Sequence, residues 1–512
     1  MDRLLLQTLF IFTMLWSFSA QAVSDTANKS NTVRITSPFE FTSLDPSQQG
    51  YLFTRMQVIE TLLNVNEQGS LVAGLATQWS INDQGRVWRF ELRPDVRFHN
   101  GTALTAEGVV NSLRRAQERQ GPFNKVPVKD IRVDEQNQVI IELERPYRTL
   151  GAVVAHYSTA IIAPAGLDDK GQVTQLVGTG PYQMVSFEPP HAFQVQRFDS
   201  YWGQVASIEY ATYLTSHRAE SRVLQARTGQ ADVVFNLDPA SVMQLKRLPS
   251  VQLESLNLPR TLMVKVNSQH PFLNEPNARR ALSLAINRVG IAQAILRTPG
   301  AETDQLLPAS MPLWHLDREL EPSDLTHAKA LLGQLGWVAD DEGMLVRDGK
   351  PFSLRLITYA DRPELTTVAT ALQDQWKQLG IQVSVDITNS SSIPAGHQDG
   401  TLEMALIARN YGFIADPLEV IRLDFGSEQG GDWGAMGWDS ETQKDIEQMS
   451  DVNDPQRYKA LAQKVASAIY DERPVIPVAA YTQHVAVQKR VKGVKLDPYE
   501  RTFYINEWEW AK

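Results

Sequence analysis

The chain has 512 residues, no cysteine and a formal net charge of −10, from 49 Lys and Arg against 59 Asp and Glu. Without cysteine it can form neither a disulfide bond nor a lipid-modified cysteine, and its acidic balance disfavours nucleic acid or an anionic membrane surface as a partner. A chain of this length is too long for one compact core, so we expect two or three domains.

The first residues, MDRLLLQTLFIFTMLWSFSAQAVSD, predict a cleaved secretory signal peptide. Arg3 precedes an apolar stretch that ends near Phe18, and small residues follow through Ala22 at the spacing that a signal peptidase requires. The stretch is short for a permanent transmembrane helix, and a retained membrane anchor is the alternative. We therefore expect a signal peptide over 1–22 and a soluble protein in the periplasm after cleavage near Ala22.

The first half of the remaining chain has an α+β pattern. Short strands are expected over 79–96, followed by a helix over about 106–117 with Thr105 as its N-cap. Residues 131–143 are typical of a hairpin. The long apolar strand TLMVKVN at 261–267 then marks the expected boundary between two lobes.

The second half has an α/β pattern. Apolar spacing predicts a helix over 324–336 and an alternating strand over 352–356. A second helix over 364–379 and a second alternating strand over 381–387 follow. Strand, helix and strand at this spacing form a β-α-β unit with two parallel strands.

One later strand of this half ends in residues suited to a ligand crevice. The segment ALIARNYGFIADP at 405–417 starts as a buried strand and then presents Arg409, Tyr411 and Phe413 around Gly412. Ligands of α/β sheets bind beyond the carboxyl ends of the strands, so this segment indicates a binding site.

No catalytic or metal-binding motif is present in the sequence. There is no G-x-S-x-G, H-E-x-x-H or P-loop, and the nine His residues include no pair at metal-ligand spacing. We therefore expect a binding protein without a cofactor, not an enzyme. A periplasmic hydrolase and a sensor that binds without transport are the alternative classes.

Nine segments, in order along the chain, resemble the extracytoplasmic solute-binding proteins of ABC importers, family 5, the peptide/nickel-binding class. They are LDP at 44–46, LVAGLATQW at 71–79, GRVWRFELRPDVRFHNG at 85–101, VGTGPYQ at 177–183, RFDSYWG at 197–203, RTGQADVV at 227–234, ARRALSLAINR at 278–288, HAKALLGQLGW at 327–337 and DP at 416–417. Together they span nearly the whole chain after the signal peptide.

The resemblance implies an α/β, bilobal periplasmic-binding-protein fold of the large peptide/nickel type (type II), with an extra α+β subdomain in the first lobe. Lobe I would comprise 23–265 and 485–512, with the subdomain inserted over about 63–175, and lobe II would comprise 266–484. The protein would be a monomer that closes on a small molecule between the lobes. The closed form would be recognised by an ABC permease and its ATPase in the inner membrane.

The resemblance also narrows the ligand. Peptide-binding members hold the peptide ammonium with an Asp where this chain has Phe413, so a free dipeptide is disfavoured unless another carboxylate substitutes. ARNYGFIADP is instead similar to nickel-binding members, which take the metal as a complex with a small carboxylate chelator. Nickel or another metal as such a chelate is therefore the predicted ligand, and an oligopeptide or dipeptide is the alternative.

The predicted ligand-binding residues are Arg409, Tyr411, Phe413, Tyr51, His156 and Tyr157. Arg409 and Tyr411 are expected to face the interlobe cleft and hold the acidic, flat part of the ligand. A structural pairing of Arg409 with Asp416 is the competing interpretation.

The remaining predicted residues come from the first lobe. Tyr51 lies where the first pocket loop of the family passes, and His156 and Tyr157 stand where nickel-binding members have Arg. His156 is also a candidate metal ligand. The His that nickel-binding members place after the DP pair is missing from 425–434, so a carboxylate-bearing ligand without metal is a further alternative.

Overall fold

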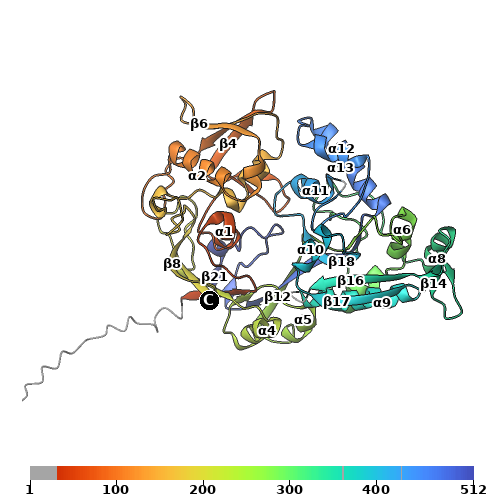
Figure 1. Ribbon diagram of the computed structural model, residues 1–512. Helices are drawn as coiled ribbons and strands as arrows, with labels where there is room; N and C mark the ends of the chain where they lie inside the picture. The colour runs from red at the N-terminus through yellow and green to blue at the C-terminus, as the bar shows by residue number, and fades with distance from the viewer. Residues whose placement is uncertain (1–30, 360–361, 428) are drawn as a thin grey trace, which may run out of the picture.

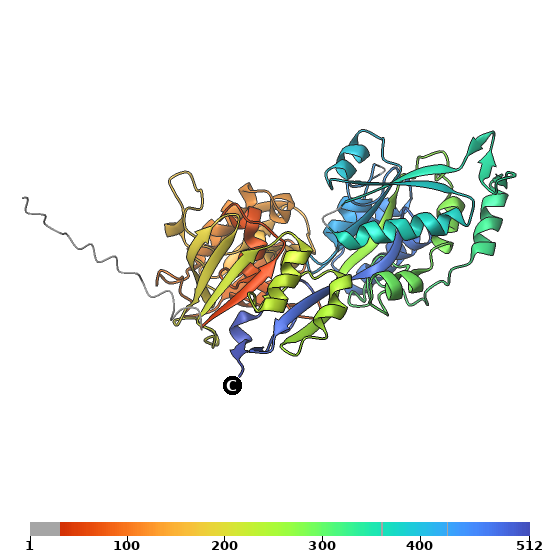
Figure 2. The ribbon, with the colours of Figure 1, turned by 90° about the horizontal axis from the view of Figure 1, so that it is seen from below.

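The computed structural model describes residues 31–359, 362–427 and 429–512. The predicted signal peptide, 1–22, lies outside the described residues. Within them, no helix combines the length and apolar character that crossing a membrane would need. The described chain forms two halves, joined at the lower edge of Figure 1 and seen from below in Figure 2.

A ten-stranded sheet runs through both halves. Its strands in the first half are β1 (Thr32–Ser37), β8 (Tyr182–Glu188), β9 (Ala192–Arg197), β10 (Tyr210–Thr215) and β11 (Val233–Val234). Its strands in the second half are β16 (Ser353–Tyr359), β17 (Gln382–Thr388) and β18 (Met404–Asn410), and β12 (Val251–Val266) and β19 (Val475–Gln488) run through both. The spatial order is β17-β16-β18-β12-β19-β11-β1-β10-β9-β8.

The predicted β-α-β unit is confirmed in the second half. The chain runs from β16 through α9 (Pro363–Lys377) to β17, and the two strands pair in parallel over their full length. Leu365, Val368 and Leu372 of α9 are fully buried, as the apolar spacing predicted. Burial of this stripe against the sheet is what holds the helix in place.

The strands β12 and β19 connect the halves (Figure 2). Their antiparallel pairing is regular from Val251 to Asn257 of β12, is interrupted, and resumes at Thr261. Beyond the interruption β12 also pairs with β18, while β19 pairs with β11 in the first half. We propose that the halves turn about this irregular stretch. The predicted lobe boundaries, 265/266 and 484/485, lie within the same two strands and stay a prediction.

A smaller antiparallel sheet stands on the first half, in the order β4 (Ala76–Ile81), β5 (Val87–Leu92), β7 (Val139–Leu143) and β6 (Val128–Val133). β6 and β7 form the predicted hairpin. α2 (Ala106–Glu118) packs on these two strands, and its N-cap is Thr105, whose hydroxyl accepts a hydrogen bond from the Gly108 N–H at 3.1 Å.

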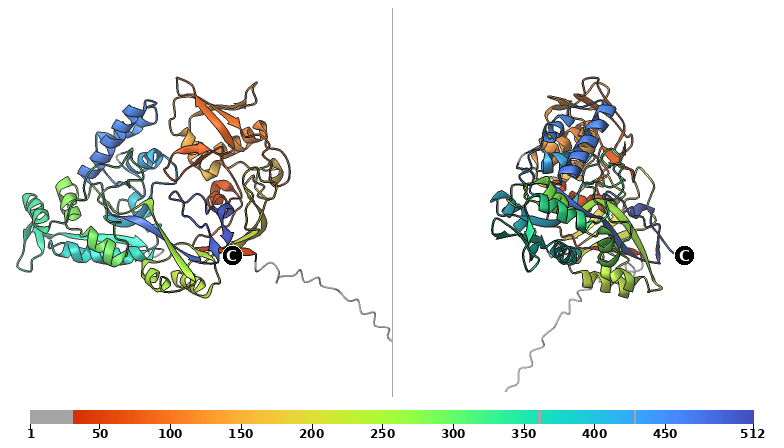
Figure 3. Two further views of the ribbon diagram at one scale, coloured as in Figure 1. Left: turned by 180° about the vertical axis from the view of Figure 1, so that it is seen from behind. Right: turned by 90° about the vertical axis from the view of Figure 1, so that its right-hand side faces the viewer.

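Helices of the second half stand opposite this smaller sheet, on the same side of the large sheet (Figures 1 and 3). They are α11 (Leu418–Phe425), α12 (Thr442–Met449) and α13 (Pro455–Glu472). The other α-helices of four or more residues in the described chain are α1 (Pro46–Arg55), α3 (Leu150–Val154), α4 (Ala219–Thr228), α5 (Pro239–Leu245), α6 (Pro276–Leu284), α8 (Leu325–Gln334) and α10 (Ser392–Gln398). The remaining short strands include β2 (Leu63–Val65) and β3 (Leu71–Ala73).

Two of the recognised segments, VGTGPYQ and RFDSYWG, meet at the carboxylate of Glu60. Glu60 accepts hydrogen bonds from Thr179 Oγ1 at 2.8 Å, Tyr201 OH at 2.9 Å and Trp202 Nε1 at 3.0 Å. The Glu60 carboxylate therefore holds these two segments together in the folded chain.

Candidate ligand site between the two halves

A cavity of about 640 Å³ lies between the two halves, and we call it the interlobe cavity. A volume of this size suits a small-molecule ligand. The cavity is lined by Pro38, Phe39, Glu40, Tyr51, His217, Arg222, Asn236, Leu237 and Asp238 from the first half, by Arg260 and Tyr481 from β12 and β19, and by Tyr359, Arg362, Glu364, Ser390, Ala408, Arg409, Asn410, Phe413 and Trp433 from the second half.

Aromatic rings form much of the wall. Phe39 and Tyr51 meet edge to face at 6.0 Å between ring centres, and Tyr359 and Trp433 meet in the same way at 6.4 Å. Phe413 is 48% exposed, so its ring is accessible at the cavity. Such rings offer flat contact surfaces to a ligand and carry no charge of their own.

Three of the four arginines in the lining are engaged by partners in the described chain. Arg409 donates Nε to Asp424 Oδ2 at 2.6 Å and Nη2 to Oδ1 at 2.8 Å. Arg260 donates to Glu500 Oε2 at 2.7 Å. The guanidinium of Arg222 donates to backbone carbonyls, among them those of Ser216 and Asn236.

Arg362 is the fourth, and it differs from the others. The described residues give its guanidinium neither a hydrogen bond nor an ion pair, and it lies 4.9 Å from the ring centre of Tyr481. It stands at the N-cap of α9, directly before the helix that follows the carboxyl end of β16. Glu364 and Glu500 act on its charge through space, but its N–H donors have no polar partner among the described residues, and this favours a ligand that carries a carboxylate.

Glu364, two residues further on, brings a carboxylate into the same cavity. Its Oε1 is buried and has no hydrogen-bond partner among the described residues. Burial raises the pKa of Glu364 above its ordinary value, although the neighbouring Arg362 opposes the shift. The other acids of the lining have partners: Asp238 caps α5, and Glu40 lies 2.6 Å from His217 Nε2.

Three predicted residues line the interlobe cavity: Arg409, Phe413 and Tyr51. The guanidinium of Arg409 pairs with Asp424 rather than with Asp416, which instead accepts hydrogen bonds from the Tyr458 hydroxyl. Arg409 therefore keeps only part of its donor capacity for a ligand.

The structure places Tyr411 away from the cavity, which corrects our expectation that it faces the cleft. Its side chain is fully buried, and its hydroxyl lies 3.8 Å from Met263 Sδ. The physical reason is that β18 ends at Asn410 and the Tyr411 N–H turns to the Pro259 carbonyl at 2.8 Å. The alternation of a strand therefore no longer governs the direction of the ring.

His156 and Tyr157 do not line the interlobe cavity either. His156 is buried, its Nδ1 lies 2.9 Å from Ser158 Oγ, and burial lowers its pKa to about 3, so the imidazole is neutral. Tyr157 packs behind Tyr51, with 5.9 Å between ring centres. Among the described residues, no group of three or more His, Cys, Asp or Glu side chains is arranged to hold a metal ion.

Sequence reasoning missed Arg362 and Glu364. A signal was available, because the pair begins the helix of the predicted β-α-β unit, and the start of such a helix lies at the carboxyl edge of the sheet. Arg260 and Tyr481 carried no comparable signal, since they reach the cavity only through the crossing of β12 and β19.

Two α/β halves, two connecting strands and a charged, aromatic cavity between the halves define a two-lobed solute-binding protein. The chain belongs to the bacterial extracellular solute-binding proteins, family 5, whose middle region matches residues 70–432. The predicted family, fold class and solute-binding function are thereby confirmed.

The curated relatives are binding proteins. The dipeptide-binding protein of Escherichia coli K12 is 23% identical over 473 residues, covering 85% of this chain and 86% of its own length. The nickel-binding periplasmic protein of the same organism is 23% identical over 467 residues, covering 87% and 88%.

Solved structures share the fold. NikA from Brucella suis in complex with Fe(III)-EDTA superposes with a TM-score of 0.86 at 20% identity, covering 94% of this chain and 100% of that one. NikA from Staphylococcus aureus in complex with Ni(L-His)2 superposes with a TM-score of 0.77 at 20% identity, with the same coverage.

Proposed function

We propose that the protein is the receptor of an ABC importer and that it captures a small carboxylate-bearing solute in the interlobe cavity. Nickel or another metal, held as a small carboxylate chelate, is the first candidate. The observation that carries the proposal is Arg362, whose guanidinium lines the cavity without a polar partner in the described chain.

A ligand carboxylate would supply the hydrogen-bonding partner that the described residues do not give Arg362. The planar guanidinium can donate two parallel hydrogen bonds to one carboxylate, which fixes orientation as well as charge. The rings of Tyr51, Tyr359 and Phe413 would then cover the flat part of the solute. As the halves close, the negative charge of the ligand carboxylate would offset the positive charge of Arg362.

A metal would have to arrive with its own chelator. The described residues offer no group of side chains that could hold a metal ion directly, so a bare cation has no evident site among them. A chelate presents carboxylate oxygens at its surface, and these are what Arg362 can bind. The nickel and iron complexes named for the two NikA structures are solutes of this kind.

Glu364 favours a second candidate, a dipeptide or short peptide. Its carboxylate could receive the ammonium that Phe413 cannot hold, while Arg362 binds the terminal carboxylate. A zwitterionic ligand would then satisfy both unpartnered groups at once. The dipeptide-binding relative is consistent with this alternative.

Family 5 proteins work with an ABC permease and an ATPase, and one of the curated relatives named above is a periplasmic protein. We propose the same setting here: a periplasmic monomer, free after removal of residues 1–22, that delivers its closed form to an inner-membrane permease. Closure about the β12–β19 crossing would bury the ligand and present both halves to that permease.

Isothermal titration calorimetry of the ligand-stripped protein tests the proposal. The probes are a nickel–L-histidine complex, free Ni²⁺, L-histidine alone, and a dipeptide and tripeptide mixture. We expect binding by the complex and none by free Ni²⁺. Arg362→Gln should weaken it by about tenfold or more, since a charge-assisted pair is lost. The matched control is Arg218→Gln, at an exposed arginine outside the lining.

The variant Glu364→Gln separates the two candidates. Peptide binding should weaken in this variant, because the ammonium loses its carboxylate, whereas binding of an anionic chelate should stay equal or tighten. Equal affinity of the wild-type protein and Arg362→Gln for every probe would refute a carboxylate site at Arg362.

A further inference from the structure

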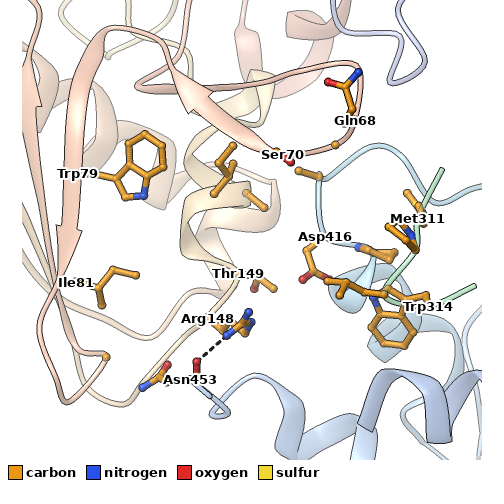
Figure 4. Close-up of a pocket in the computed structure, with 18 of the residues that line it drawn as sticks. Gln68, Ser70, Trp79, Ile81, Arg148, Thr149, Met311, Trp314, Asp416 and Asn453 are labelled. Atoms are coloured by element: carbon orange, nitrogen blue, oxygen red, sulfur yellow. Dashed lines mark hydrogen bonds between the residues drawn. The ribbon is translucent and has the colours of Figure 1, made fainter. Parts of the chain in front are cut away.

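A second cavity, of about 660 Å³, lies between the smaller sheet and the second half (Figure 4). We call it the distal cavity. It shares no lining residue with the interlobe cavity, and the loop from Tyr411 to Pro417 runs between the two, with Phe413 at one and Ala415 at the other. None of the sequence-predicted site residues lines it.

The walls of the distal cavity are apolar and come from both sides. Figure 4 shows Trp79 and Ile81 of β4 across from Met311 and Trp314 of the second half. Ile81 is 45% exposed, and Leu313 beside Met311 is also exposed, so the cavity presents apolar surface to solvent. An apolar occupant would remove this surface from water.

Two buried hydrogen-bond donors in this lining have no acceptor. The indole N–H groups of Trp88 and Trp314 are buried and unpartnered among the described residues, and both side chains are only 2% exposed. An indole can only donate, so each group needs an acceptor from water or from an occupant.

The lining of the distal cavity holds one cation, Arg148, and two carboxylates, those of Asp83 and Asp416. Arg148 lies over the Tyr458 ring at 4.3 Å and donates Nη1 to the Asn453 carbonyl at 2.8 Å, but it forms no ion pair within the described chain. The carboxylate of Asp416 faces this space (Figure 4) and accepts from the Tyr458 hydroxyl, and Asp83 is exposed to solvent. Nε and Nη2 of Arg148 have no hydrogen-bond partner among the described residues, so they can donate to the carboxylate of a ligand.

We propose that the distal cavity is a second binding site, for a flat apolar molecule that carries one carboxylate. The ring system would lie between Trp79 and Met311, and the carboxylate would accept hydrogen bonds from Arg148 and from the Trp314 indole. The proposal is argued from the lining of the distal cavity alone and does not use the identity of the solute in the interlobe cavity.

Calorimetric titration with indole-3-acetate tests the proposal, and 3-methylindole serves as the uncharged analogue. The acid should bind and the analogue should bind at least about tenfold more weakly, as expected for loss of a charge-assisted hydrogen bond. Trp314→Phe keeps a ring and removes the N–H, and Arg148→Gln removes the charge. Each should weaken binding of the acid by about tenfold.

The matched control is Trp337→Phe, because Trp337 also has a buried, unpartnered indole N–H but lies outside both cavities, stacked on Phe352 at 4.3 Å. Its affinity for the acid should match the wild type. If Trp314→Phe does not fold, Ile81→Gln replaces it in the titration. This exposed residue lines the cavity, and its substitution should weaken binding of the acid.

Three results would overturn the proposal. The acid could fail to bind at millimolar concentration, or its affinity could be unchanged in Arg148→Gln and Ile81→Gln. It could also be lost in Arg362→Gln, which would place the acid in the interlobe cavity instead. Because Arg362→Gln should otherwise leave this titration unchanged, failure here and failure of the carboxylate site at Arg362 are distinguishable.

Discussion

Arg409 and Asp424 form a two-point ion pair in the wall of the interlobe cavity, with Nε–Oδ2 at 2.6 Å and Nη2–Oδ1 at 2.8 Å. The Asp424 side chain is 1% exposed and that of Arg409 is 15% exposed. Although burial opposes it, Asp424 raises the pKa of Arg409 above its ordinary value, as expected for a paired guanidinium. The pair ties β18 to α11 behind the cavity, so its main role is to hold the wall together.

Arg409→Ala should therefore lower stability more than it lowers ligand affinity. It leaves the Asp424 carboxylate buried without its partner, which costs about 3–5 kcal/mol in comparable buried pairs. Urea unfolding followed by circular dichroism measures the loss. In Arg409→Ala with Asp424→Asn the free energy of unfolding should recover in part, since the unpaired charge is gone.

A ligand-binding role of Arg409 would give the opposite result. If Arg409→Ala abolished binding of the nickel–histidine complex while the urea midpoint stayed at the wild-type value, Arg409 would be a ligand residue, as the sequence pattern first indicated.

Glu500 forms the second buried ion-pair centre, and it gives a pH-dependent prediction. It pairs with Arg260 at 2.7 Å and with Arg55 at 3.6 Å, and it joins the C-terminal segment to both α1 and β12. Burial alone would raise the pKa of Glu500, but Arg260 and Arg55 hold it below its ordinary value of 4.5.

A carboxylate with a lowered folded pKa stabilises the protein above its unfolded pKa, and this contribution is lost as the pH falls through the folded pKa. The wild type should therefore lose stability below pH 4.5. Glu500→Gln should be less stable than the wild type at pH 7 by about 3–5 kcal/mol, and its free energy of unfolding should depend less on pH below 4.5. The control Glu441→Gln breaks an exposed pair with Lys444 and should change stability by less than about 1 kcal/mol. Parallel pH curves for wild type and Glu500→Gln would contradict the assignment.

The sequence supported the β-α-β unit, the helix caps and the family because these depend on local periodicity and on ordered segments. It also led to Arg409, Phe413 and Tyr51 in the cavity lining. The partner of Arg409 could not be predicted, because Asp424 reaches it only after the chain has turned into α11. Arg362 could not be singled out for the same kind of reason, because only the folded chain shows which guanidinium groups have a hydrogen-bond partner among the described residues.

Tyr411→Phe tests whether that ring has a role in binding. The hydroxyl lies beside Met263 Sδ at 3.8 Å in a fully buried position, so its removal takes away little more than a weak contact. The free energy of unfolding in urea should change by less than about 1 kcal/mol. The affinity for the nickel–histidine complex should stay within twofold, which corresponds to about 0.4 kcal/mol. A tenfold loss of affinity would return Tyr411 to the ligand site.

Lys265 gives the last prediction, because it is fully buried and forms no ion pair with a carboxylate of the described residues. Its Nζ donates to the Gly431 and Gly434 carbonyls at 2.8 Å and lies 2.8 Å from His397 Nδ1. The segment it holds carries Trp433, which lines the interlobe cavity. Burial lowers the pKa of Lys265 to about 7, although Asp424 and Asp432 oppose the shift and Arg409 adds to it.

Because the unfolded chain binds the Lys265 proton up to its ordinary pKa of 10.5 and the folded chain only up to about 7, this group makes stability rise with pH between those values. The slope cannot exceed about 1.4 kcal/mol per pH unit for one proton. The free energies of unfolding of the wild type and Lys265→Met are compared in urea from pH 7 to 9.5. The wild type should gain stability relative to the variant as the pH rises through this range. If the difference between the two proteins stays constant with pH, Lys265 keeps its proton throughout, held by the carbonyls of Gly431 and Gly434.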